Sequence, residues 1–263
     1  MRAGSIFWGS AVIIGGVILL GNNLGWFGQT NVWILIGPAF LILLGIWLLA
    51  GPYLFKNIKV ETETVSIPVG DARELSIKIE HGAGKLTVDS GNDPSSLVSG
   101  TLVGGAEKTI KYEGGLTKVK FEGHSFFMFP GSSPLDWTLH VNPNLPLRLS
   151  LEGGASDNTL HLRDLKVTSL KIETGASSTN VELPSSAGFT KVKVDAGAAS
   201  IRLMVPEGVA AHIKVDGALM GKAINTTRFP LAMNNVYESV DYGTASNKVE
   251  IDIDMGAGSL DIQ

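Results

Sequence analysis

The sequence predicts a membrane-anchored all-β protein, in which a two-helix transmembrane hairpin is followed by a β-solenoid-like domain with rungs of 20–22 residues. Two uncharged apolar stretches of 18 residues, at about residues 4–21 and 32–49, predict the hairpin. From Val60 onward, apolar and polar residues alternate with period two, which indicates strands with one buried face. Gly-Ala pairs recur at steps of 21, 22 and 20 residues, a spacing typical of stacked coils, and they begin at Gly154, Gly175, Gly197 and Gly217.

The hairpin domain is predicted over residues 1–55. As a helix, each apolar stretch would reach about 27 Å, close to the hydrocarbon thickness of a bilayer. Arg2 precedes the first stretch, Lys56 and Lys59 follow the second, and the connection carries no charge, so the positive-inside rule places both ends and the β domain in the cytoplasm. Two alternatives stay open: a cleaved signal peptide for the first stretch, and a pair of buried core helices.

Charge and cysteine content exclude several functions. The chain carries a formal net charge of −4, and its first 59 residues hold three basic and no acidic residues, so the remainder carries −7. An acidic domain argues against nucleic acid as a partner and against electrostatic docking on anionic lipid. The absence of cysteine excludes disulfides, thiolate catalysis and Cys-type zinc sites.

The β domain is predicted over residues 60–263, and its clearest phrase is Lys-apolar-acid followed by a Gly-Ala turn, as in 171–176, 193–198 and 214–218. Each rung should run strand, Gly-Ala corner, strand, and then a turn marked by Pro184 or Pro206. We expect the corner glycine to adopt φ > 0 and the alanine to keep the inside of the bend small. The structural corners predicted are Gly82, Gly154, Gly175, Gly197, Gly217 and Gly256.

Stacking in register would align the charges of successive rungs. The lysines would form one outward column and the acids a second column two residues further along, and the two would neutralise each other: Lys171, Lys193 and Lys214 beside Glu173, Asp195 and Asp216. In the last phrase, residues 252–258, Asp252 stands in the place of the lysine. The repeat lapses between residues 98 and 146, and a second irregular insertion covers 225–247.

Few residues suggest chemistry. Glu250, Asp252 and Asp254 alternate on one predicted strand, which would permit a cation site or acid/base work. The alternative is a stripe of charge that protects an edge rung from pairing. The five histidines lack metal-ligand spacing and are expected on the surface or in strands. We therefore predict no enzyme activity, no metal and no cofactor.

One apolar run lies in the irregular interval. It could cap the end of the solenoid, enter the bilayer interface or contact a partner protein, and it consists of Phe126, Phe127, Met128 and Phe129.

The corners, and the closing run 249–260, resemble the toastrack domain of bacterial envelope proteins. The segments 4–9, 21–25 and 36–38 resemble the hairpin of LiaI- and LiaF-type proteins. This resemblance implies a multi-pass bacterial membrane protein that acts in envelope stress sensing through protein contacts, with a sensor histidine kinase as a possible partner besides the lipid bilayer. The alternatives are a structural subunit that forms homo-oligomers or attaches to another membrane complex, and an adhesin-like surface protein if the topology is inverted.

Overall fold

The computed structural model describes residues 3–26, 33–54, 62–123 and 135–263. The chain divides into two compact units. The first comprises residues 1–60 and 125–133, and the second comprises 61–124 and 134–263. The apolar run 126–129 lies outside the described residues, as do Lys56 and Lys59.

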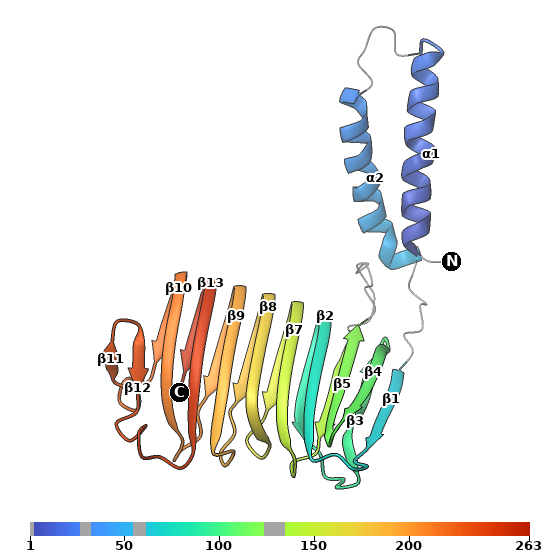
Figure 1. Cartoon of the computed structure of the whole chain (residues 1–263). Helices are drawn as coiled ribbons and strands as arrows, with labels where there is room; N and C mark the ends of the chain where they lie inside the picture. The colour runs from blue at the N-terminus through green and yellow to red at the C-terminus, as the bar shows by residue number, and fades with distance from the viewer. Residues whose placement is uncertain (1–2, 27–32, 55–61, 124–134) are drawn as a thin grey trace. The chain divides into compact units, whose positions relative to one another are not determined.

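The first unit contains two helices that lie side by side, α1 (Ala3–Asn23) and α2 (Trp33–Leu54) (Figure 1). Neither helix carries an acidic residue in its first turn or a basic residue in its last turn. Within the described part of the chain, no helix combines the length and the apolarity required to cross a membrane, so the two predicted spans are not confirmed.

The second unit contains all the strands of the described residues and no helix. They are β1 (Thr62–Pro68), β2 (Glu74–Ser90), β3 (Ser96–Val103), β4 (Ala106–Glu113), β5 (Leu116–Gly123), β6 (Trp137–Val141), β7 (Pro146–His161), β8 (Lys166–Glu182), β9 (Phe189–Met204), β10 (Ala210–Ile224), β11 (Leu231–Met233), β12 (Val236–Glu238) and β13 (Lys248–Ile262).

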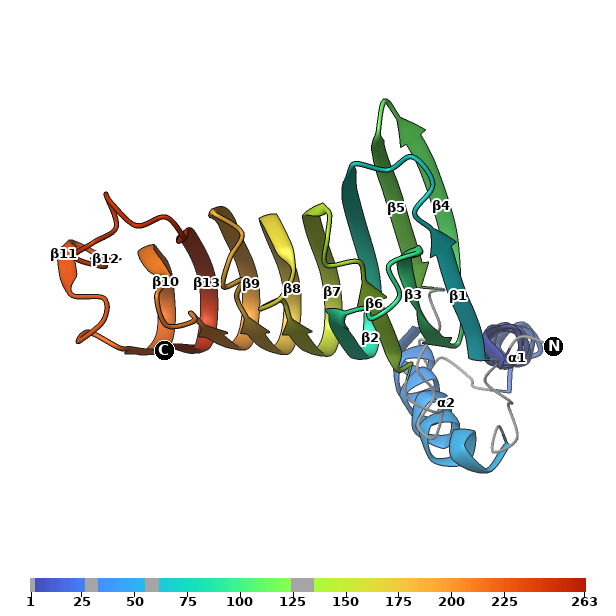
Figure 2. The same cartoon turned by 90° about the horizontal axis from the view of Figure 1, so that it is seen from below.

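Six long parallel strands form the stack, in the order β2, β7, β8, β9, β13, β10 (Figures 1 and 2). Each bends at its Gly-Ala corner without interruption, so the strand-corner-strand prediction is confirmed, with the two half-strands joined into one. We call the part of each strand before the corner the first arm and the part after it the second arm. In β8, for example, the arms are residues 166–174 and 176–182.

Shorter strands extend both arms. At one end of the stack, β5 and β4 continue the first arm, while β6, β3 and β1 continue the second. At the other end, β12 and β11 continue the first arm only. The described part of the irregular interval 98–146 thus adds β5 and β6 in parallel to the end rung β2, with β4 and β3 antiparallel to them, and part of the insertion 225–247 forms the β11–β12 hairpin.

The last strand of the chain is not the last rung of the stack. β13 lies between β9 and β10, with Asp252 aligned to Lys193 on one side and to Lys214 on the other. The interpretation of its acidic stripe as protection of an edge rung is therefore wrong. β13 has a strand on each side, and the stack ends at β10.

The core fills the space between the arms. Inward side chains of neighbouring rungs align, so that Ile172 of β8 lies beside Val194 of β9, and both are fully buried. Fully burying one such aliphatic side chain contributes about 1.5–3 kcal/mol. Phe229, which follows β10, is also fully buried. Alternation of apolar and polar residues in the sequence therefore did identify the buried face.

The corner glycines do not adopt the predicted φ > 0; none of the six is among the glycines with positive φ. At five of the six the selection has another cause, because the glycine lies directly against a backbone carbonyl of a neighbouring rung; an added Cβ at Gly82, on the first rung, would meet no atom within 4 Å. A Cβ added at Gly154 would lie 2.5 Å from the oxygen of Gly82, and one added at Gly175 would lie 3.0 Å from that of Gly154. The same close approach continues at Gly197 and Gly256, whereas Gly217 is aligned one position earlier and lies against the carbonyl of Met255. Glycine is needed because the rungs leave no volume for a side chain.

The alanines of the corners are placed differently from the prediction. Ala155, Ala176 and Ala198 occupy aligned positions and are exposed, so they lie on the outside of the bend. The stack therefore does not require a small residue there, and the rung at β10 carries Leu219 in the same column.

Candidate interaction surface

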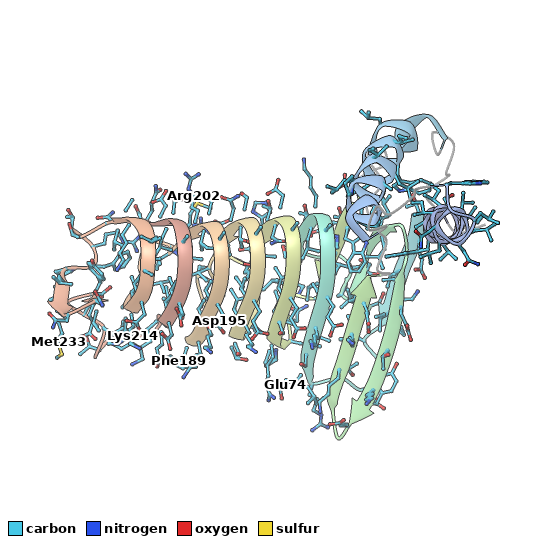
Figure 3. The ribbon with its side chains drawn as sticks, turned by 90° about the horizontal axis from the view of Figure 1, so that it is seen from above. Glu74, Phe189, Asp195, Arg202, Lys214 and Met233 are labelled. Atoms are coloured by element: carbon cyan, nitrogen blue, oxygen red, sulfur yellow. The ribbon has the colours of Figure 1, made fainter. Side chains whose placement is uncertain are left out.

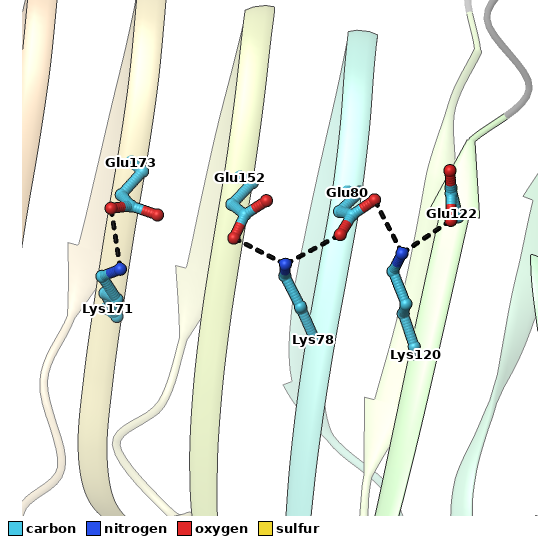
Figure 4. A network of polar contacts seen from close by, with 7 residues as sticks. All are labelled: Lys78, Glu80, Lys120, Glu122, Glu152, Lys171 and Glu173. Atoms are coloured by element: carbon cyan, nitrogen blue, oxygen red, sulfur yellow. Dashed lines mark hydrogen bonds and ion pairs between the residues drawn. The ribbon is translucent and has the colours of Figure 1, made fainter. Parts of the chain in front are cut away.

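The outer face of the first arm carries the two charge columns that the sequence predicted. Lys78 Nζ lies 2.8 Å from a carboxylate oxygen of Glu80 and 2.8 Å from one of Glu152 on the neighbouring rung. Lys120 Nζ contacts Glu80 at 3.0 Å and Glu122 at 2.6 Å, so the ion pairs run from rung to rung (Figure 4). The hydrogen bonds that Lys78 donates to Glu152 and Glu80 raise the pKa of Lys78, and those that Glu80 accepts from Lys78 and Lys120 lower the pKa of Glu80.

Within single rungs the same pairing repeats. Lys171 lies 2.7 Å from Glu173, and the next two rungs that carry the phrase repeat it at 3.1 Å and 2.8 Å, between Lys193 and Asp195 and between Lys214 and Asp216. These side chains are substantially exposed, so each pair is screened by water and contributes little to stability. The face is soluble and self-neutralised, as predicted, and its charges are already paired within the chain.

Two of the three carboxylates of β13 lie near lysines of adjacent rungs, and the third, Asp254, is aligned with Asp195 and Asp216. Glu250 lies 3.2 Å from Lys191 of β9, and Asp252 lies 4.0 Å from Lys214 of β10. Asp254 also contributes to raising the pKa of Lys214. The basic partners that were missing from the local sequence are thus supplied by neighbouring rungs. Across the described residues, no group of three or more metal-ligating side chains is arranged to hold an ion.

Among the four histidines that the structure describes, His81 alone is buried. Its Nε2 lies 3.0 Å from the carbonyl oxygen of Leu135, and its ring centroid lies 4.8 Å from that of Trp137. Burial lowers the pKa of His81, although the Leu135 carbonyl and Asp136 oppose that shift. Nδ1 of His81 and Oδ1 of Asp136 are buried without a hydrogen-bond partner among the described residues.

The outer face of the second arm lies on the opposite side of the stack, as Arg202 lies opposite Asp195 and Lys214 in Figure 3. It is hollowed into a shallow trough of about 630 Å³, because the aligned residues are small: Ser178, Ser200, Ser259 and Gly221. Arg202 Nε donates to Asp261 at 3.0 Å beside them. The trough offers hydroxyl groups and a paired charge, and no aromatic side chain lines it.

The C-terminal end of the stack is the most apolar exposed part of the second unit. Leu219 of β10 is 79% exposed, and Leu231 and Met233 of β11 are 60% and 73% exposed. Val240, in the turn after β12, is 95% exposed. Beyond Val215, whose N–H donates to the carbonyl oxygen of Asn235, β10 pairs with β13 on one side only, so unpaired backbone and exposed apolar side chains occur together at this end. We call this region, made of 217–224, β11 and Val240, the C-terminal end surface.

The structure thus assigns different roles to the site residues predicted from the sequence. Five of the corner glycines form one column, in which the role of Gly154, Gly175, Gly197 and Gly256 is steric, and Gly217 lies one position before it. Two of the three carboxylates of β13, Glu250 and Asp252, are paired with lysines. The run Phe126–Phe129 lies outside the described residues, so its role stays a prediction. The C-terminal end surface was missed. Its only sequence signal was the replacement of the corner Gly-Ala-small pattern by Gly217-Ala218-Leu219-Met220.

Comparison with known proteins agrees with the solenoid architecture. A protein of Clostridium sporogenes ATCC 15579 described as "a putative cell adhesion protein" has 17% identity and a TM-score of 0.72, and the match covers 78% of this chain and 99% of that one. A protein of Bacteroides fragilis NCTC 9343 described as "a putative adhesin" has 8% identity and a TM-score of 0.32, with 79% and 98% covered. At such identities only the first likeness is informative, and it concerns the fold. None of the curated proteins matches the chain.

Family membership follows from the sequence itself. Residues 56–204 match the family described as the N-terminal domain of toast_rack, DUF2154, which is more than half of the chain. The match begins just before the first strand and ends with β9, so it includes the first four long strands of the stack. The corner pattern that suggested a toastrack domain is thereby confirmed, and the chain belongs to the toast_rack family.

Proposed function

We propose that this protein is a non-enzymatic, membrane-anchored scaffold or regulator of the bacterial cell envelope, which acts through protein contacts made by its solenoid. The observation that carries the proposal is the C-terminal end surface. Leu219, Met233 and Val240 are highly exposed at the same end where a strand edge is unpaired. Exposed apolar groups of this kind mark interaction sites more often than catalytic ones.

The proposed anchor is the helical unit. Both 18-residue apolar stretches lie within α1 and α2 apart from Val32, and both helices expose large aliphatic side chains, among them Val12, Val17, Leu41 and Leu49. Lipid would cover such side chains. The three flanking basic residues support a cytoplasmic solenoid. Protease added to intact cells should then spare the solenoid, whereas release of a soluble β domain would contradict this topology.

The proposed partner is a sensor histidine kinase, as the likeness to LiaF-type proteins suggests. A photoreactive amino acid placed at Leu231 of the full chain, in the membranes of its host, should crosslink to the kinase. The matched control at Asp157, exposed on the outer face of β7, should not. Purified kinase reconstituted with this protein should autophosphorylate more slowly than kinase alone. Unchanged autophosphorylation, together with equal crosslinking from both positions, would rule out the regulatory role.

A second candidate is an adhesin-like surface protein. It is favoured by the fold likeness to the Clostridium sporogenes protein, which is described as a cell adhesion protein. It requires the solenoid outside the cell, so the protease experiment distinguishes the two. A structural subunit of a membrane complex would instead copurify at fixed stoichiometry in detergent, without affecting kinase activity.

A further inference from the structure

The second arm of the solenoid ends at an unpaired strand edge. β10 pairs with β13 from Ala210 to Ile224, but on its other side β12 covers only His212–Lys214. Among the described residues, no strand pairs with 217–224 on that side. The backbone N–H and C=O groups there are the template that an incoming strand requires. An extended segment is therefore the kind of partner that this edge fits.

The other sheet edges are protected against strand pairing. β4 presents four charged side chains, and β1 ends in Pro68, which has no N–H to donate. β11 is only three residues long. Charge, proline and shortness are the usual means of blocking an edge. The segment 217–224 has no proline and a single charged residue, Lys222, so it is the least protected edge of the described sheet.

We infer that this edge pairs with the same edge of a second copy of the chain, antiparallel about a two-fold axis at Gly221. Pairing with β4 of another copy would bring a charged strand against the edge, and pairing with either β1 or β4 would propagate into an open filament. Self-pairing has neither consequence, because a two-fold contact uses the same surface on both copies and closes at two.

The choice of axis follows from side-chain direction, size and charge. Opposite residues of an antiparallel pair point to the same face, so the axis must pass through a residue. An axis at Gly221 sets Leu219 opposite Ala223 and Met220 opposite the aliphatic stem of Lys222. An axis at Lys222 would instead set two ammonium groups opposite each other. Gly221 has room for the approach, since the nearest atom to an added Cβ is the oxygen of Gly258 at 4.0 Å.

The residue types at the corner of β10 are also those expected of a surface that another copy covers. Every other long strand has alanine in the outward corner column, where β10 has the exposed Leu219. The next column holds glycine, serine or alanine in the other rungs and Met220 in β10. Met220 packs against the core, so Leu219 is the large apolar side chain that this rung exposes, at the same end of the stack as β11 (Figure 1).

Single cysteines test the pairing, because the chain contains none. Gly221→Cys places a thiol at the axis, within disulfide distance of its counterpart. Ser178→Cys is the matched control, since it lies in the same exposed outward column three strands away, about 14 Å from β10. After oxidation of the full chain in detergent with copper phenanthroline, the disulfide dimer should be at least about fivefold more abundant for Gly221→Cys. Equal yields, or no dimer from Gly221→Cys, would overturn the inference.

A second variant covers failure of Gly221→Cys to fold, which far-UV circular dichroism would reveal. The double variant Leu219→Cys with Ala223→Cys places two disulfides across the axis and should crosslink to a similar extent, whereas either single variant should not. Crosslinking by both singles would overturn the proposed register. The crosslinking result is independent of the proposed kinase contact. If the protein is a monomer and still slows kinase autophosphorylation, only the dimer inference is wrong. If it forms the dimer but does not affect autophosphorylation, only the proposed regulatory function is wrong.

Discussion

The corner glycines and the column of lysines run along the same rungs, three or four residues apart, and they repeat in the sequence for different physical reasons. The glycines repeat because the backbone of one rung contacts the backbone of the next, as between Gly175 and the oxygen of Gly154. The lysines repeat because an exposed face needs charge that neutralises itself, as between Lys171 and Glu173. The two columns are equally regular in the sequence, but the glycine column follows from a strict steric constraint and the lysine column from a permissive electrostatic one.

The largest effect is expected at the corner. Gly154→Ala places a methyl group 2.5 Å from the oxygen of Gly82, and because that atom belongs to the backbone it cannot move aside. We expect a loss of about 3 kcal/mol in the free energy of unfolding, as in severe overpacking. Gly175→Ala, at 3.0 Å, should cost less. Denaturant unfolding of the full chain, followed by circular dichroism, measures both.

Ala176→Val is the control for that series. Its side chain is exposed on the outside of the same corner, so added volume meets solvent. A loss as large as that of Gly154→Ala would mean that β propensity or bend geometry, rather than contact between rungs, selects the corner residues.

A smaller effect is expected at His81, beside the first corner. Burial lowers the pKa of its imidazole in the folded protein from the ordinary value of 6.5. Between the two pKa values the unfolded chain binds a proton that the folded chain does not, so stability is complete above about pH 6.5 and falls as the pH decreases below it. The melting temperature should therefore decrease between pH 7 and pH 5.

The variant His81→Gln separates this effect from other titrations. Its amide can still donate a hydrogen bond to Leu135 but does not titrate, so the decrease from pH 7 to pH 5 should be smaller than in the wild type. An identical pH dependence of the melting temperature would show that His81 is not the source.

The next effect tests the order of the rungs. Asp252→Lys restores the repeated phrase, but it also places three lysines on adjacent strands, because β13 lies between Lys193 and Lys214. We expect a lower melting temperature at low ionic strength and recovery at high salt, where like charges are screened. Asp252→Asn, which loses a carboxylate without adding a cation, should show much less salt dependence. A variant as stable as the wild type at low salt would contradict this alignment.

The smallest effect is expected for Lys193→Ala. Hydrogen bonding to Asp195 raises the pKa of Lys193, but the side chain is exposed and the ion pair is solvated. The melting temperature should stay within measurement error. A clear decrease would indicate that the lysine column is covered by a partner, and the distinction between the two columns would then fail.

Local alternation was enough to identify most strands and their buried faces. Leu147–Leu151 and Trp137–Val141 are strands as predicted, with their apolar residues in the core. The corner positions were predictable because the Gly-Ala pair repeats. The C-terminal end surface was less so, since it depends on β10 being the end of the stack, with β13 paired between it and β9, which no local pattern encodes.

The sequence by itself determined the family, the rung period, the strands and the pairing of charge along the first arm, because these depend on residues that are near in the chain or repeat at a fixed step. The tertiary structure decided the order of the rungs, the true role of the corner glycines and the burial of His81. These depend on which segments become neighbours across long separations: β13 inserts between β9 and β10, and the backbone of one rung excludes a Cβ on the next. The sequence repeat specifies the residues of a rung, but the position of that rung in the stack depends on the strands that it packs against.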